Sequence, residues 1–204
     1  GLCNGTFQIF SSDHAPTRYD DPRGKKLKGE KSSFRWIPNG IPGIETRMPL
    51  LFSEGVMKGR IDIHTFVGLT ATNPAKMYGL HPKKGSIAVG ADADLVIWDH
   101  EREVTISNDL LHHNVDYTPY EGMKIRGWPD TVISRGEIVF SNNQLTAEEG
   151  RGCFISGNPP AAALPSSIPV TDQSIDPISI NFEFFPVQRS GAFASREIPR
   201  YLRR

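Results

Sequence analysis

An aspartate and a histidine lie side by side where a short apolar segment meets a long irregular one. Thr6–Ser12 is apolar and β-prone, and Asp13 and His14 follow it directly. Functional groups gather at the carboxyl ends of strands in parallel α/β proteins. A carboxylate there can ligate a metal or accept a proton, and a neighbouring imidazole can orient it. The pair also fits a structural role, with Asp13 capping the loop and His14 packed beside it, and spacing alone favours that role.

Four other histidines give a weaker signal for chemistry. His112 and His113 are adjacent, so in a strand they face opposite sides and cannot easily bind one ion. His64 is expected on the solvent side of a helix, and His81 precedes a proline, so structural roles are favoured for all four. The sequence has no HxH or HExxH motif and no CxxC pair, and therefore does not contain a complete metal site.

A basic segment with aromatic residues nearby could indicate nucleic-acid binding. Residues 23–31 carry five basic side chains, and Phe34 and Trp36 follow them. Acidic residues within and beside the run dilute its charge, so a solvated loop is the favoured interpretation. The chain also lacks a phosphate-binding glycine loop and a GxSxG nucleophile motif.

The composition narrows the class of protein further. The 204 residues carry 23 basic and 23 acidic side chains, and the pI near 7.2 argues against a dominant role in binding polyanions. No stretch approaches the roughly 20 apolar residues of a membrane helix. Only two cysteines occur, Cys3 and Cys153, and such sparse usage is typical of a reducing, intracellular compartment. The first residue is Gly rather than Met, so we expect the start to be missing.

The elements that must position Asp13 follow from the periodicity. Thr6–Ser12 predicts a strand, and the breaker-rich residues 13–44 predict a long loop. Three helices are expected next: Thr46 and Asp62 are the expected N-caps of the first two, and the third should begin at Asn73. Side chains at helical spacing predict the buried faces of the first two helices: Met48, Leu51, Phe52 and Val56, then Ile63, Phe66, Val67 and Thr70.

Beyond residue 85 the pattern changes to short β-prone runs. They are Ser86–Val89, Leu95–Trp98, Glu103–Ile106, Thr131–Ser134 and Ile138–Ser141. Turn residues separate most of them, which indicates an antiparallel sandwich or meander, with a domain boundary near residues 82–85. Residues 157–190 hold six prolines and few charges, and predict an irregular segment.

Four segments form a specific pattern when taken together. They are SSDHAP (11–16), IPNGIPGIETRMPLLFSEGV (37–56), TATNPAKMYGLHPKKGSIAVGADADLVIWD (70–99) and VDYTPYEGMKIRGWP (115–129). These segments resemble the C-terminal part of the hydantoinase and dihydropyrimidinase family, the cyclic amidohydrolases of the amidohydrolase superfamily. The likeness runs from about residue 5 to about residue 156.

The resemblance implies an α/β fold that is the C-terminal portion of a (β/α)₈ TIM barrel with a small β-sandwich. Residues 1–84 would supply the last strand and closing helices of the barrel, and 85–156 strands of the composite sandwich. Residues 157–204 would form an irregular Pro/Ser-rich tail. Residues 157–195 match nothing in the family, which suggests an insertion or an unspliced intron.

The resemblance also implies site residues and an activity. Asp13 matches the family's last-strand aspartate, which ligates the more exposed of two zinc ions and moves the proton. Asn39 matches the position whose backbone holds the cyclic imide. The implied reaction is hydrolysis of the ring amide C–N bond of hydantoins or 5,6-dihydropyrimidines, a step of pyrimidine catabolism, by a cytoplasmic homotetramer. The partner would be a small cyclic amide or imide, with no nucleic acid and no membrane.

Other members of the family are non-catalytic. Those dihydropyrimidinase-related proteins replace the aspartate and carry Glu in place of the asparagine, so Asp13 and Asn39 favour the enzyme lineage. The family's remaining zinc ligands, an HxH pair, a carboxylated lysine and two histidines, lie upstream and are absent from this chain. The chain alone is therefore expected to be inactive. A scaffold protein of the same fold and a truncated, non-functional gene product are the alternatives.

Overall fold

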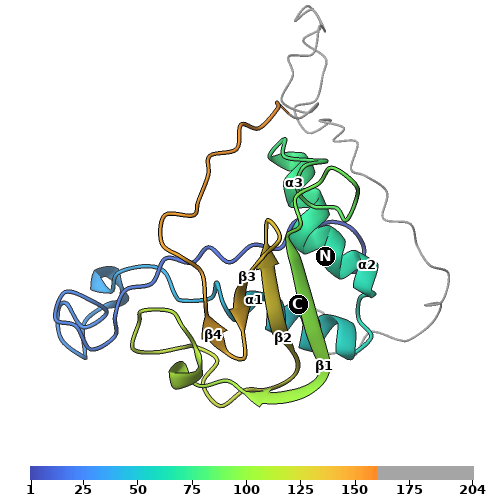
Figure 1. The fold of residues 1–204 in the computed structure, drawn as a ribbon. Coiled ribbons are helices and arrows are strands. Elements are labelled where there is room, and N and C mark those ends of the chain that lie inside the picture. The colour runs from blue at the N-terminus through green and yellow to red at the C-terminus, as the bar shows by residue number, and fades with distance from the viewer. Residues whose placement is uncertain (160–204) are drawn as a thin grey trace, which may run out of the picture. The chain divides into compact units, whose positions relative to one another are not determined.

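The computed structural model describes residues 1–159, in which two helices pack on an antiparallel sheet (Figure 1). The first helix is α1 (Arg47–Leu51), which continues into the π-helical turn η2 (Phe52–Met57). The second helix consists of α2 (Ile63–Val67), the π-helical turn η3 (Gly68–Thr72) and α3 (Asn73–Met77) without a break. Two single 3₁₀ turns, η1 (Phe34–Trp36) and η4 (Asn108–Leu110), lie in loops. None of the helices in this part of the chain has the length and apolarity to cross a membrane.

The start of α2 agrees with the predicted cap. The Asp62 carboxylate accepts a hydrogen bond of 2.7 Å from the Thr65 N–H, as an N-cap side chain should. Thr46 precedes α1 but has helical dihedral angles and forms no capping hydrogen bond. The third helix begins at Asn73 as predicted, but it continues directly from η3. Asn73 does not cap it, because its side-chain amide donates to the Gln8 carbonyl at 2.9 Å.

The buried faces of the helices are narrower than the spacing predicts. Phe52 and Phe66 are buried as expected, but Ile63 and Val67 are 46% and 44% exposed, which corrects that part of the prediction. Leu69, three residues beyond Phe66 and on the same face, is buried in their place.

The sheet has the order β1-β2-β3-β4, with every neighbouring pair antiparallel, so of the two expected arrangements, sandwich and meander, these strands form the meander. Its strands are β1 (Leu95–Thr105), β2 (Lys124–Ser134), β3 (Glu137–Ser141) and β4 (Gln144–Leu145). Strand β1 joins two of the predicted runs across an irregularity between Asp99 and Glu103. The turns at Arg135-Gly136 and Asn142-Asn143 all have positive φ, as tight hairpins require.

The predicted strand Ser86–Val89 is wrong. This segment belongs to no ladder within residues 1–159, and the side chains of Ile87 and Val89 are fully solvent-facing at 88% and 109% relative exposure. An alternating apolar run becomes a strand only where a neighbouring backbone and a core face are available to it.

An aromatic cluster joins the helices to the sheet. The Phe52 ring from η2 stacks on the Trp98 ring of β1 at 4.6 Å, and Phe66 of α2 meets both rings edge-on at 5.5 and 5.8 Å. Gly127 of β2 passes so close that a Cβ atom there would lie 2.4 Å from the Phe52 ring. A second core cluster consists of Ile125 and Trp128 of β2 and of Ile106, which directly follows β1.

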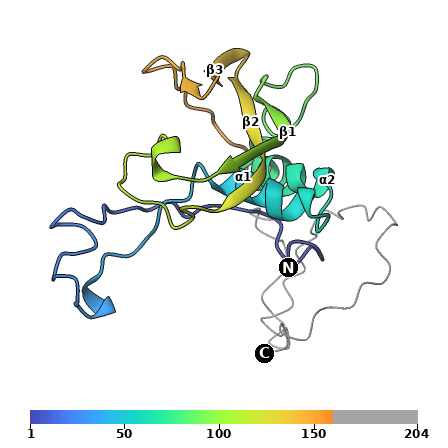
Figure 2. The same cartoon turned by 90° about the horizontal axis from the view of Figure 1, so that it is seen from below.

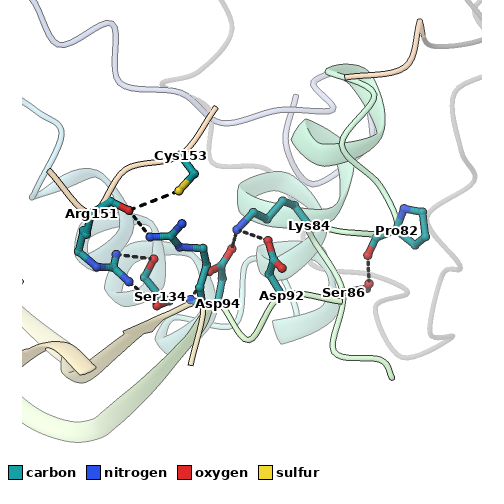
Figure 3. Close-up of polar contacts among 9 residues, drawn as sticks. Pro82, Lys84, Ser86, Asp92, Asp94, Ser134, Arg151 and Cys153 are labelled. Carbon is teal, nitrogen blue, oxygen red and sulfur yellow. Dashed lines mark hydrogen bonds and ion pairs between the residues drawn. The ribbon is translucent and has the colours of Figure 1, made fainter. Parts of the chain in front are cut away.

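The GADADL motif forms a polar cluster between the helices and the sheet (Figure 3). The Lys84 ammonium pairs with the Asp92 carboxylate at 2.8 Å and also with Asp94. Asp94 in turn accepts a 2.8 Å hydrogen bond from the Arg135 N–H at the β2–β3 turn. Burial acts to raise the pKa of Asp94, but the bonds from Lys84 and Arg135 outweigh it and hold the pKa below its usual value. This motif therefore fixes structure.

Candidate functional site

The segment that leads to Asp13 is extended but is not a strand, which corrects the prediction for Thr6–Ser12. Hydrogen bonds from the helices hold it instead: Phe10 donates its N–H to the Leu69 carbonyl at 3.0 Å, and Arg47 donates to the Phe10 carbonyl at 2.5 Å. A strand needs a ladder. Within the described part of the chain, the pairing here is one isolated parallel bridge between His14 and Ile41.

Asp13 occupies an unusual backbone conformation with an open carboxylate. Its φ of +45° lies in the left-handed region, where a non-glycine residue is strained and where functional residues are over-represented. The side chain is exposed and forms no hydrogen bond or ion pair with any described residue. Asp13 therefore does not cap the loop, and its carboxylate is available to an added ligand or proton.

His14 connects the Asp13 segment to the loop that carries Asn39. The His14 Nδ1 atom accepts hydrogen bonds from the Gly43 N–H at 3.1 Å and the Ile44 N–H at 3.2 Å. An accepting Nδ1 carries no proton, so the neutral ring has its hydrogen on Nε2. The imidazole orients a loop backbone and forms no hydrogen bond with the Asp13 carboxylate.

The structure brings the Asp13 and Asn39 segments together. Gly40 has φ +88°, and a Cβ atom there would lie 1.9 Å from the Ala15 carbonyl oxygen, so the two backbones meet directly. Asn39 is exposed, and neither its side chain nor its backbone N–H and C=O forms a hydrogen bond with the described residues. A free backbone donor and acceptor thus lie beside the segment of the free carboxylate.

Lys25 is a site neighbour that the sequence interpretation missed. Its ammonium donates to the Pro38 carbonyl at 2.6 Å and to the Gly40 carbonyl, on both sides of Asn39. The sequence favours a solvated loop for the whole basic run, but the Lys25 ammonium is bound to main-chain carbonyls. Nothing in the spacing distinguishes Lys25 from the other lysines, because its acceptors are main-chain atoms 13 and 15 residues away.

The loop of residues 13–44, which extends to one side of the sheet (Figure 2), is tied to another segment of the family-like pattern, DYTPYEGM. The Asp116 carboxylate accepts hydrogen bonds from the Tyr19 N–H at 2.7 Å and the Asp20 N–H at 2.8 Å. Burial acts to raise the pKa of Asp116, but these N–H groups lower it overall. Asp116 therefore anchors the loop.

The adjacent histidines have intramolecular partners. The Glu45 carboxylate accepts from the His112 N–H at 2.6 Å and pairs with His112 Nδ1 at 2.8 Å, which raises the pKa of His112. His113 Nε2 lies 3.0 Å from Asn108 Oδ1, and burial lowers the pKa of His113. Both arrangements agree with the structural roles that the sequence favours.

The described residues can contribute to a metal centre but do not form one. No group of three or more His, Cys, Asp or Glu side chains in residues 1–159 could hold an ion. The open Asp13 carboxylate suits zinc, which accepts carboxylate oxygen ligands. This part of the chain thus fits the role of a single ligand.

The family model, the similar sequences and the similar solved structures all point to the same group of enzymes. The model of the amidohydrolase family matches residues 1–139. The D-hydantoinases of Ralstonia pickettii and Geobacillus stearothermophilus are 44% and 48% identical to this chain over 154 residues, which is 76% of the chain. The crystal structure of dihydropyrimidinase from Brevibacillus agri superposes with a TM-score of 0.67 at 48% identity, over 71% of this chain and 31% of that one. The chain spans about a third of the length of the curated relatives, 33% and 32%.

Proposed function

Because this chain belongs to the amidohydrolase family, we propose that it is the C-terminal part of a metal-dependent cyclic amidohydrolase. The substrates would be hydantoins or 5,6-dihydropyrimidines, opened at the ring amide C–N bond. The observation that carries the proposal is the pairing of an exposed, partner-free Asp13 carboxylate with an exposed Asn39 whose backbone polar groups are also free within the described residues. The names of the relatives, D-hydantoinase and dihydropyrimidinase, support the substrate class.

Each of the two residues has a proposed task. Asp13 would be one ligand of a pair of zinc ions, the others coming from outside this chain. When bound, zinc supplies Lewis-acid chemistry and lowers the pKa of water. The Asp13 carboxylate would accept the proton of the attacking water and deliver it to the departing ring nitrogen. The Asn39 N–H would donate to a ring carbonyl oxygen, and its carbonyl would accept the ring N–H.

The proposal includes the organisation of the whole protein. Residues 1–84 would form the last strand and closing helices of a (β/α)₈ barrel, and residues 85–156 part of a β-sandwich. The extended segment before Asp13, which the helices already hold through Leu69 and Arg47, would pair as a strand with barrel strands from upstream. The expected tail, residues 157–204, lies outside the described residues from position 160 onward. A homotetramer in the cytoplasm completes the proposal.

The upstream coding sequence is the direct test. We expect it to encode an HxH pair, a lysine and two further histidines as zinc ligands. In the complete protein, Asp13→Ala should abolish hydrolysis of dihydrouracil and hydantoin while size-exclusion chromatography shows unchanged assembly. Asn39→Ala is the matched comparison: only its backbone is proposed to act, so this variant should retain most of its turnover.

Two results would contradict the proposal. Turnover retained by Asp13→Ala would mean that another group carries the proton. An upstream sequence without the five ligands would favour the non-catalytic scaffold protein of the same fold.

A further inference from the structure

Two side chains outside the proposed chemistry hold the two ends of the Asn39 loop. We propose that Lys25 and His14 are positioning residues, which set the backbone of residues 38–44 so that Asn39 can bind the cyclic imide. This inference rests on the proposed function, because it names what orients the substrate-binding backbone. The two residues act at opposite ends of the loop and by opposite chemistry, Lys25 as a donor and His14 as an acceptor.

Lys25 determines which way the Asn39 N–H points. The Lys25 ammonium draws the Pro38 carbonyl toward itself at 2.6 Å and also binds the Gly40 carbonyl. In a planar trans peptide the C=O of one residue and the N–H of the next point in opposite directions. The Asn39 N–H therefore points away from Lys25. Within the described residues Lys25 has no carboxylate partner, so its charge is directed at these carbonyls.

The backbone of Lys25 is itself fixed. Its N–H donates to the Arg18 carbonyl at 2.9 Å, and the preceding Gly24 packs so closely that a Cβ atom would lie 2.0 Å from the same oxygen. Asp116 holds the adjacent Tyr19 N–H at 2.7 Å. Because the Lys25 backbone is fixed by these contacts, its side chain can hold residues 38–40 in place instead of moving together with them.

His14 fixes the far end of the loop through one ring nitrogen. Nδ1 accepts from both the Gly43 and Ile44 N–H groups, at 3.1 and 3.2 Å. Because His14 follows Asp13 directly, the contact sets the position of the loop relative to the open carboxylate. If this contact matters, the acceptor must lie where Nδ1 lies. Asparagine places its Oδ1 atom there, whereas the amide of glutamine reaches the Nε2 position. Both side chains carry the same amide, so a difference between the two variants comes from the position of the acceptor.

The experiment compares four variants of the complete protein: His14→Asn, His14→Gln, Lys25→Met and, as a matched control, Lys31→Met. Lys31 belongs to the same basic run, is exposed and has no partner among the described residues. Two readouts are measured, namely kcat and KM for dihydrouracil and hydantoin, and amide hydrogen exchange of residues 38–44.

We expect Lys25→Met and His14→Gln to raise KM by about tenfold or more, with a smaller change in kcat, since a hydrogen bond to a charged group or from a loop backbone is lost. The same two variants should exchange the loop amides faster. Lys31→Met should match the wild type in both readouts, and His14→Asn should recover a large part of the loss seen in His14→Gln.

Unchanged KM in Lys25→Met and His14→Gln would overturn the inference, whether or not exchange rises, because the loop position would then not govern binding. Equal behaviour of the two His14 variants would overturn the role of Nδ1, even if Lys25→Met fails to fold. A wild-type protein that hydrolyses neither substrate overturns the proposed function instead. In that case the exchange rates still show whether the two residues hold the loop.

Discussion

At the scale of single residues, the candidate site places side chains without hydrogen-bond partners next to side chains that hold the loop backbone. The Asp13 carboxylate and Asn39 have no hydrogen bonds within the described residues, while the side chains of His14 and Lys25 make two each. The strained φ of +45° at Asp13 adds to this contrast, because the surrounding contacts must compensate for its cost of about 1–3 kcal/mol. This combination, polar groups without partners on a backbone that neighbouring side chains hold in place, is what a binding site requires.

The His112–Glu45 pair predicts a pH dependence of stability. Glu45 raises the pKa of His112 above the ordinary value of 6.5, so the folded state binds this proton more tightly than the unfolded state. The stabilisation is fully present below pH 6.5 and is lost as the pH rises through the higher folded-state pKa. His112→Gln should therefore reduce the fall in the free energy of unfolding between about pH 6 and about pH 8.5.

Urea unfolding across this pH range measures the effect. His64→Gln is the control, because the His64 side chain is exposed and has no partner among the described residues. An identical pH slope in His112→Gln and the wild type would show that the pair contributes nothing to stability.

At the scale of elements, one glycine permits the helices and the sheet to meet. Gly127→Ala combines a disfavoured φ of +95° with a Cβ atom 2.4 Å from the Phe52 ring. We expect a loss of about 2–4 kcal/mol in the free energy of unfolding. Gly136→Ala, at φ +83° with no atom within 4 Å, isolates the backbone contribution and should cost less than half as much.

Chemical denaturation measures the free energy of unfolding of both variants, and the difference between them is the contribution of the clash with the Phe52 ring. If Gly127→Ala and Gly136→Ala lose the same stability, the Phe52 ring moves away freely, and the contact between the helices and the sheet is not tightly packed.

Sequence patterns predicted an element correctly where the contact that determines it lies within a few residues along the chain. Asp62 caps its helix because the acceptor and the Thr65 N–H are three residues apart. The cap predicted at Asn73 failed because the partner of its side chain, Gln8, is 65 residues away. The same reasoning separates the site residues. Asp13 and Asn39 were found through a resemblance of motifs, whereas the role of Lys25 depends on how a glycine- and proline-rich loop folds back on itself.

At the scale of the whole molecule, the chain carries one proposed ligand and no further metal site within residues 1–159. We therefore expect purified 1–204 to hydrolyse neither dihydrouracil nor hydantoin, with or without added zinc. Ring opening followed by absorbance is the measurement. An Asp13→Ala version of the same chain serves as a blank for contaminating hydrolase, and zinc-stimulated activity above that blank would contradict the expectation.

The stack of Trp98 on Phe52 also gives the molecule an intrinsic optical probe. The three tryptophans lie in different surroundings: Trp98 between helices and sheet, Trp128 in the sheet core at 3% exposure, and Trp36 beside the Asn39 loop at 58% exposure. Trp36 is the most exposed of the three, so iodide in solution should quench it first, and this first quenching phase reports on the loop. A red shift of the emission below the melting temperature, accompanied by additional iodide quenching, reports instead on separation of the helices from the sheet, because Trp98 then meets solvent.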